Sequence, residues 1–240
     1  QFVVNNQLDE YDAAMGFLNV PSVAKALFDN RNNRTFSYDL DLVADYATHR
    51  KQLETKYRNF VIFHLYGQHM PAKERYPKEF AKFTPNNINR PELNKAQCND
   101  VAHYLNATLY NDLVVDSIIR MFENRNAVVM YLSDHGEEVH NFRNQYGRTD
   151  INKDCRESYA PQFDIPFMVY LTPSYAKEHP ELATRLEAAS HRRFSNDDTP
   201  QVICDILGVQ SAYVRLQHSF INDSYIAPRH RLITKDKYYD

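Results

Sequence analysis

Several features that would narrow the function of this protein are scarce in its sequence. It has only five glycines and three cysteines, and no apolar run long enough to span a bilayer. With so few glycines, long flexible hinges are not expected. The cysteines, Cys98, Cys155 and Cys204, include no close pair, which excludes zinc-finger spacing, and an apolar neighbourhood predicts a buried thiol for Cys204. A basic surplus is also lacking, since the net charge is −3, and this argues against nucleic acid as a partner.

The N-terminal sequence lacks the marks of a complete precursor. It begins with Gln rather than Met, and residues 1–6 contain neither a basic segment nor a long apolar core, so no signal peptide is recognised. We therefore expect a processed or truncated piece, with any membrane anchor outside it. The 240 residues, 43% of them hydrophobic, suffice for one domain with a substantial core.

Apolar patterns along the chain alternate between helical and strand periods, which predicts an α/β layered sandwich with a largely parallel central sheet flanked by helices. Two short runs are almost wholly apolar, as in strands buried on both faces. Thr199 is expected to cap a short helix that ends at Gly208. The expected strands are residues 2–4, 59–65, 127–132 and 165–171, and the expected helices are 21–29, 39–56, 99–124 and 199–207.

Chemically active side chains follow two of these strands, where α/β sheets bind ligands. Asp134 and His135 follow Leu132 and Ser133, and a carboxylate beside an imidazole at a strand end suits zinc or, less well, manganese. Gly136 is expected to permit a tight turn away from the site. The alternative is a structural turn in which Asp134 only caps the backbone.

Two histidines flank the end of the first long strand. His69 lies in the loop after Leu65 and could bind metal, donate to a phosphate oxygen or act as a general acid. The alternative is an ordinary surface-loop histidine. His64 lies within the apolar run and is interpreted as structural.

Four segments, in order, resemble motifs of one enzyme family. Residues 64–83 contain His-x-x-Gly-x-His-x-Pro followed by Arg-Tyr-Pro, residues 104–112 resemble its Tyr-rich helix, and residues 131–137 resemble its metal-binding turn. Residues 194–208 form the fourth segment. The chain is thus similar to the bacterial lipid A and lipopolysaccharide-core phosphoethanolamine transferases of the sulfatase/alkaline-phosphatase superfamily.

This resemblance implies an alkaline-phosphatase-like fold, with residues 1–240 as the C-terminal part of a single sulfatase-like catalytic domain. It also implies a catalytic domain in the periplasm, anchored in the inner membrane of a Gram-negative bacterium by a domain outside this chain that meets the membrane surface. The implied reaction moves phosphoethanolamine from phosphatidylethanolamine to lipid A or the lipopolysaccharide core through a covalent phospho-Thr, with zinc as cofactor.

The family's zinc site combines a Glu, the nucleophilic Thr and the Asp-His pair, and only the pair, Asp134 and His135, is recognised here. Because residues 2–7 resemble the segment that follows the nucleophile, the nucleophile region is expected to be missing upstream. The resemblance therefore implies a piece that is inactive alone and holds zinc poorly, since zinc sites use three or four protein ligands.

Further site residues follow from the same resemblance. His69 is expected in catalysis and substrate binding. Where many members have a further His, this chain has Arg148, whose guanidinium grips phosphate, and Arg148 is therefore expected in catalysis and in substrate binding. His140 is a second candidate for substrate binding. A solvated loop arginine is the alternative for Arg148. Cys98 resembles a disulfide position whose usual partner is absent near residues 86–87, which favours the core-modifying branch or a less-studied one.

Two alternative functions remain. A sulfatase or glycerol-phosphate transferase of the same superfamily shares the Asp-His pair but not, as a rule, the Arg-Tyr-Pro segment. A non-catalytic binding module without metal is the alternative from another class.

Overall fold

The computed structural model consists of two compact units, which correspond to residues 1–121 and 122–240. The helix expected at residues 21–29, like Cys155, lies outside the described residues. The structure describes residues 2–5, 36–54, 56–142, 144–148, 156–227, 230–234 and 237–240.

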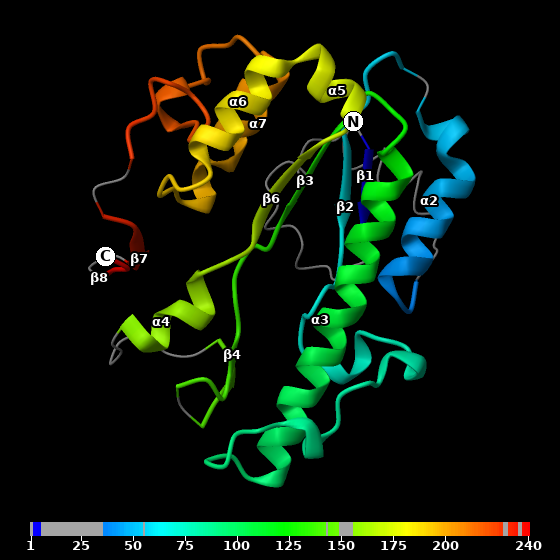
Figure 1. Ribbon diagram of the computed structural model, residues 1–240, viewed down its shortest axis with the longest axis vertical. Coiled ribbons are helices and arrows are strands. Elements are labelled where there is room, and N and C mark those ends of the chain that lie inside the picture. Colours follow the sequence, from blue (N-terminus) through cyan, green and yellow to red (C-terminus); the bar gives the residue numbers. More distant parts are fainter. Residues whose placement is uncertain are drawn as a thin grey trace. The chain divides into compact units, whose positions relative to one another are not determined.

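The first unit contains a parallel strand pair and two long helices (Figure 1). Strand β1 (Phe2–Asn5) pairs in parallel with β2 (Val61–His64), as the sequence predicted for this sheet. Helix α2 (Asp39–Leu53) packs on β2 through its buried face, where the rings of Tyr46 and Phe63 meet edge to face at 4.9 Å. The residues of β2 are half-buried, whereas the apolar run predicted a fully buried strand.

Helix α3 (Lys95–Phe122) begins four residues earlier than its apolar pattern predicted. The reason is a reciprocal cap: the side chain of Asn94 accepts from the Gln97 N–H at 3.0 Å, and the Gln97 side chain accepts from the Asn94 N–H at 2.7 Å. Among the described helices, none is both long and apolar enough to cross a membrane. Three short 3₁₀ turns precede α3, namely η3 (Ala72–Glu74), η4 (Lys78–Phe80) and η5 (Pro85–Asn87).

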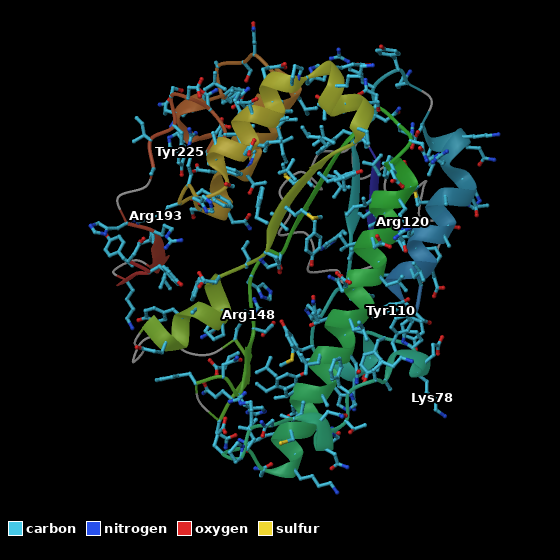
Figure 2. All side chains as sticks on the ribbon, in the orientation of Figure 1. Lys78, Tyr110, Arg120, Arg148, Arg193 and Tyr225 are labelled. Atoms are coloured by element: carbon cyan, nitrogen blue, oxygen red, sulfur yellow. The ribbon has the colours of Figure 1, made fainter. Side chains whose placement is uncertain are left out.

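Tyr110 on α3, labelled in Figure 2, gives the first unit a pH dependence at alkaline pH. Burial, with a smaller contribution from the Asp41 and Asp39 carboxylates, raises the pKa of Tyr110 to about 12. The unfolded chain loses this proton near pH 10, so we expect the free energy of unfolding to fall as the pH rises from about 10 to about 12. Denaturant unfolding across this range should show a smaller decrease in Tyr110→Phe, and an equal decrease in both proteins would contradict the prediction.

The second unit contains an antiparallel strand pair, β3 (Val128–Leu132) and β6 (Phe167–Leu171). The expectation of a parallel arrangement is wrong for this pair. The connecting segment contains α4 (Arg156–Phe163), and the carbonyl of Gln162 accepts from the Gly136 N–H at 2.8 Å. The chain therefore enters β6 from the end at which it left β3, which forces the antiparallel direction.

Helices α6 (Pro180–Ala189) and α7 (Thr199–Leu207) lie side by side and cover this strand pair (Figure 1). Their shared core is continued by residues of the two strands, including Met130 and Phe167. The buried members of the cluster are Leu182, Ala189, Val202, Phe220 and Ile221. The remaining elements are β4 (Glu138–Val139), β5 (Tyr146–Gly147), α5 (Pro173–Glu178), η7 (Asn196–Asp198), η8 (Leu216–His218), β7 (Leu232–Thr234) and β8 (Lys237–Tyr238).

Of the two caps expected for α7, the structure has the one at the C-terminal end but not the one at the N-terminal end. Gly208 ends the helix in the left-handed region at φ 63°, as predicted. Thr199 is the first helical residue rather than the cap, because η7 leads directly into α7 and the Thr199 hydroxyl donates to the Asn196 side chain at 2.8 Å. Cys204 is half-buried rather than buried, since Val202 takes the inward position, and both Cys98 and Cys204 are free thiols.

Candidate active site

The two predicted site segments lie in different units. The turn after β3 carries Asp134 and His135. Their side chains are 87% and 26% exposed, and His135 Nε2 lies 3.6 Å from Asp134 Oδ2. His135 Nδ1 lies 2.9 Å from the carbonyl oxygen of Gly136. Because a carbonyl oxygen only accepts, this contact favours the tautomer with the proton on Nδ1, in which the Nε2 lone pair faces Asp134.

This pair fits two corners of a zinc site. Ligand atoms at about 2.0–2.2 Å from a tetrahedral zinc ion are separated by roughly 3.4 Å, close to the observed gap of 3.6 Å. A metal-binding histidine also usually donates its other ring N–H to an oxygen, as His135 does to Gly136. In the described part of the chain, no group of three or more His, Cys, Asp or Glu side chains is arranged to hold a metal ion. The pair therefore supplies part of such a site.

Gly136 is required for a reason that sequence analysis missed. Its φ is not in the left-handed region, so the expected tight turn is not what demands glycine. A Cβ at this position would lie 2.2 Å from the carbonyl oxygen of Pro161 and 3.0 Å from its carbon. The backbone of α4 approaches the turn so closely that only glycine leaves room for it.

Two acidic side chains support the same loop from inside. Glu137 places Oε1 3.6 Å from His135 Nδ1, and its side chain is only 8% exposed. Glu138 is fully buried, and its carboxylate accepts from the Phe142 N–H at 2.7 Å. Their positions favour shaping the loop over direct contact with an exposed metal ion.

His140 and Arg148 lie on the β4–β5 hairpin but differ in exposure. His140 is buried, has φ 55°, and stacks on the ring of Tyr146 with centroids 6.0 Å apart. Its backbone N–H donates to the Gln145 carbonyl at 2.9 Å. Arg148, labelled in Figure 2, follows β5 and is exposed. Of the two, Arg148 is therefore the side chain that can meet a dissolved anion directly.

In the first unit, His69 lies in the turn after β2 and is exposed. Its ring Nδ1 lies 2.8 Å from the Met70 carbonyl oxygen. The start of this turn is held by Asp39, a buried residue in the first turn of α2. The Asp39 carboxylate accepts from the Tyr66 N–H at 3.0 Å and from the Gly67 N–H at 2.8 Å.

Sequence analysis did not single out Asp39. Its only visible signal is an acidic residue in the first turn of a helix, which the helix dipole alone explains. The partners are 27 and 28 residues away and are backbone groups, so no residue type marks them. Asp39 therefore connects the start of α2 to the turn that presents His69.

We expect Asp39→Asn to lower the free energy of unfolding by about 2 kcal/mol, because the amide can accept only one of the two backbone hydrogen bonds. Asp41→Asn is the matched control, since Asp41 lies in the same helical turn and is exposed. Denaturant unfolding of both variants measures the difference. An equal loss in the two would show that the helix dipole, rather than the turn, is what Asp39 stabilises.

The segments at residues 75–83 and 104–112 contact each other through α3. The side chain of Asn106, 1% exposed, donates to the Phe83 carbonyl at 2.9 Å and accepts from the Phe83 N–H at 2.8 Å. Tyr76 and His103 are hydrogen-bonded at 2.7 Å. These contacts explain the residues of both segments structurally, because they attach the loop that follows His69 to α3.

Comparison with known proteins identifies the class. Residues 3–209 match the Sulfatase family, and the chain belongs to it. Among curated relatives, the phosphoethanolamine transferase EptC of Escherichia coli (strain K12) is 37% identical over 128 residues, 51% of this chain and 21% of that protein. The Kdo(2)-lipid A phosphoethanolamine 7''-transferase of the same organism is 31% identical over 120 residues, 49% of this chain and 20% of that protein. The matches thus span about a fifth of the length of these relatives.

Solved structures confirm the α/β, alkaline-phosphatase-like fold. The C-terminal periplasmic domain of EptC from Escherichia coli, in complex with Zn, superposes with a TM-score of 0.75 at 23% identity, over 99% of this chain and 67% of that one. The soluble domain of lipooligosaccharide phosphoethanolamine transferase A from Neisseria meningitidis has a TM-score of 0.63 at 22% identity, with 91% and 65% coverage. At these identities the likeness concerns the fold.

Proposed function

We propose that the protein transfers phosphoethanolamine from phosphatidylethanolamine to lipid A or the lipopolysaccharide core, and that residues 1–240 form the C-terminal part of one sulfatase-like catalytic domain. The observation that carries this is the approach of Asp134 Oδ2 to His135 Nε2 at 3.6 Å in the turn after β3. Two phosphoethanolamine transferases among the curated relatives support the reaction, and the family match, which spans both compact units, supports the single domain.

In this proposal Asp134 and His135 hold zinc, with further ligands supplied outside the described residues. Zinc bound there would supply Lewis acidity, which lowers the pKa of an attacking hydroxyl group and offsets negative charge on a phosphoryl group. In this proposal a covalent phospho-Thr carries the group between donor and acceptor. Glu137 keeps the His135 ring in its orientation through the contact at Nδ1.

The other site residues act on the substrate. His69 binds it and moves a proton at Nε2, since Nδ1 is engaged with the Met70 carbonyl. The exposed guanidinium of Arg148 binds a phosphate oxygen pair, as its planar fork allows. His140, buried against Tyr146, contributes to substrate binding by stabilising the hairpin that presents Arg148.

The location proposed for this domain is the periplasmic face of the inner membrane of a Gram-negative bacterium. Its support is the set of relatives, which includes the C-terminal periplasmic domain of EptC and the integral membrane protein lipooligosaccharide phosphoethanolamine transferase A of Neisseria meningitidis. A lipid donor and a lipopolysaccharide acceptor would both be within reach there.

The test uses the full-length protein in vesicles that contain phosphatidylethanolamine and lipid A. Mass spectrometry should show lipid A gaining one phosphoethanolamine group, and diacylglycerol should form in equal amount. An aryl sulfate supplied in parallel distinguishes the alternatives: hydrolysis of that ester without transfer would assign the protein to the sulfatases. Absence of both activities together with absence of bound zinc would favour a non-catalytic binding module.

A further inference from the structure

The side chain of His69 is exposed, so packing does little to orient its ring. Its orientation rests on one hydrogen bond, from Nδ1 to the Met70 carbonyl oxygen at 2.8 Å. Because a carbonyl oxygen only accepts, this bond selects the tautomer that is protonated at Nδ1 and leaves the lone pair at Nε2. Whatever holds the Met70 carbonyl in place therefore controls which nitrogen of His69 can accept a proton.

Arg75 holds that carbonyl. Its Nη2 donates to the Met70 oxygen at 3.3 Å, and its Nε donates to the His69 carbonyl oxygen at 2.7 Å. The Met70 carbonyl oxygen thus accepts hydrogen bonds from both the imidazole of His69 and the guanidinium of Arg75. Because Nε and Nη2 belong to one rigid guanidinium group, Arg75 fixes two successive peptide carbonyls together. A side chain with a single flexible donor group would not do so.

The guanidinium is itself anchored from two directions. It lies over the ring of Tyr66, 4.4 Å from the centroid, where the π-face attracts a cation. The backbone N–H of Tyr66 is bound by the buried Asp39 carboxylate, so the ring belongs to a restrained part of the turn. The Arg75 backbone N–H also closes η3 by donating to the Ala72 carbonyl at 3.0 Å. Arg75 is therefore held in place before any ligand arrives.

We propose that Arg75 is a positioning residue that fixes His69 in the Nδ1-protonated tautomer through the carbonyls of His69 and Met70. Its importance for turnover rests on the proposed function, but its effect on the tautomer does not. A lysine at position 75 keeps the charge and loses the fork and the planar stacking surface. The tautomer should therefore depend on the shape of the side chain and not only on its charge.

The test measures the tautomer directly in the 240-residue chain. Long-range proton–nitrogen correlation spectra of uniformly ¹⁵N-labelled protein, recorded where the imidazole is neutral, distinguish protonation at Nδ1 from protonation at Nε2. The His69 signals are assigned by their loss in His69→Gln. We expect the Nδ1-protonated pattern in the unsubstituted chain and a majority of the Nε2-protonated form in Arg75→Lys.

Arg120→Lys is the matched control, because Arg120, which is labelled in Figure 2, makes an exposed ion pair with Asp116 on α3. It should leave the His69 nitrogen shifts unchanged. Circular dichroism checks the fold, and if Arg75→Lys does not fold, Tyr66→Leu removes the stacking ring with the same expected shift. An unchanged His69 spectrum in a folded variant, or an Nε2-protonated His69 in the unsubstituted chain, would overturn the proposal.

A second readout concerns the full-length enzyme, where Arg75→Lys should lower kcat about 10-fold with little change in KM. A tautomer shift in a protein without transferase activity would refute the proposed function while supporting the role of Arg75. Transferase activity that is unaffected by Arg75→Lys, with the tautomer unchanged, would refute only the role of Arg75.

Discussion

Asp134→Ala in the full-length protein is expected to lower phosphoethanolamine transfer by about 10³-fold or more and to release zinc. Electrostatic stabilisation by a bound metal ion contributes several kcal/mol to a transition state, and about 4 kcal/mol corresponds to that factor. The carboxylate lies 3.6 Å from His135 Nε2, so its loss would leave only one of the two proposed zinc ligands in the turn. Since Asp134 is 87% exposed, its removal should hardly change the stability of the fold.

The measurement combines elemental analysis of bound zinc with the vesicle transfer assay. Asp223→Ala serves as the control, because Asp223 is an exposed aspartate in the same unit. His135→Ala should match Asp134→Ala in both readouts, whereas Asp223→Ala should match the unsubstituted protein. Full zinc content and full activity in Asp134→Ala would sink the assignment of this turn to the metal.

Gly136→Ala should destabilise the chain by about 3 kcal/mol and lower the melting temperature by roughly 6–12 °C. The added methyl carbon would stand 2.2 Å from the Pro161 carbonyl oxygen, a backbone atom that cannot rotate away. The turn or α4 must then move, and the Gly136–Gln162 hydrogen bond of 2.8 Å is lost or lengthened. Thermal unfolding of the 240-residue chain measures the effect.

Gly208→Ala is the informative control for this prediction. Gly208 has φ 63°, and a Cβ there would meet nothing within 4 Å, so alanine costs only the left-handed backbone conformation, about 1 kcal/mol. The two variants therefore separate steric overlap from backbone strain. Equal destabilisation by the two substitutions would contradict the close approach of α4 to the turn. In the full-length enzyme, Gly136→Ala should also reduce zinc binding, because it displaces the neighbouring His135.

The sequence alone determined the local elements and the family. Helix α7 ends at Gly208 because glycine tolerates the left-handed region, and β2 and β3 lie near their predicted positions because short apolar runs favour strands. Asp134 and His135 could be predicted to lie together in the loop after a strand, because they are adjacent in the chain and closely follow the apolar run of that strand. The match of residues 3–209 to the Sulfatase family confirms the superfamily that the ordered motifs indicated.

Only the tertiary structure revealed the contacts that residues make with backbone groups far away in the sequence. Pro161 excludes a side chain at Gly136, the N–H groups of Tyr66 and Gly67 bind Asp39, and β6 runs antiparallel to β3 because α4 returns the chain to the turn. The burial of His140 against Tyr146 likewise separates it from the exposed Arg148. Periodicity and spacing report a residue's immediate neighbours, whereas peptide groups are chemically alike along the chain. Only the folded structure therefore reveals which of them a side chain meets.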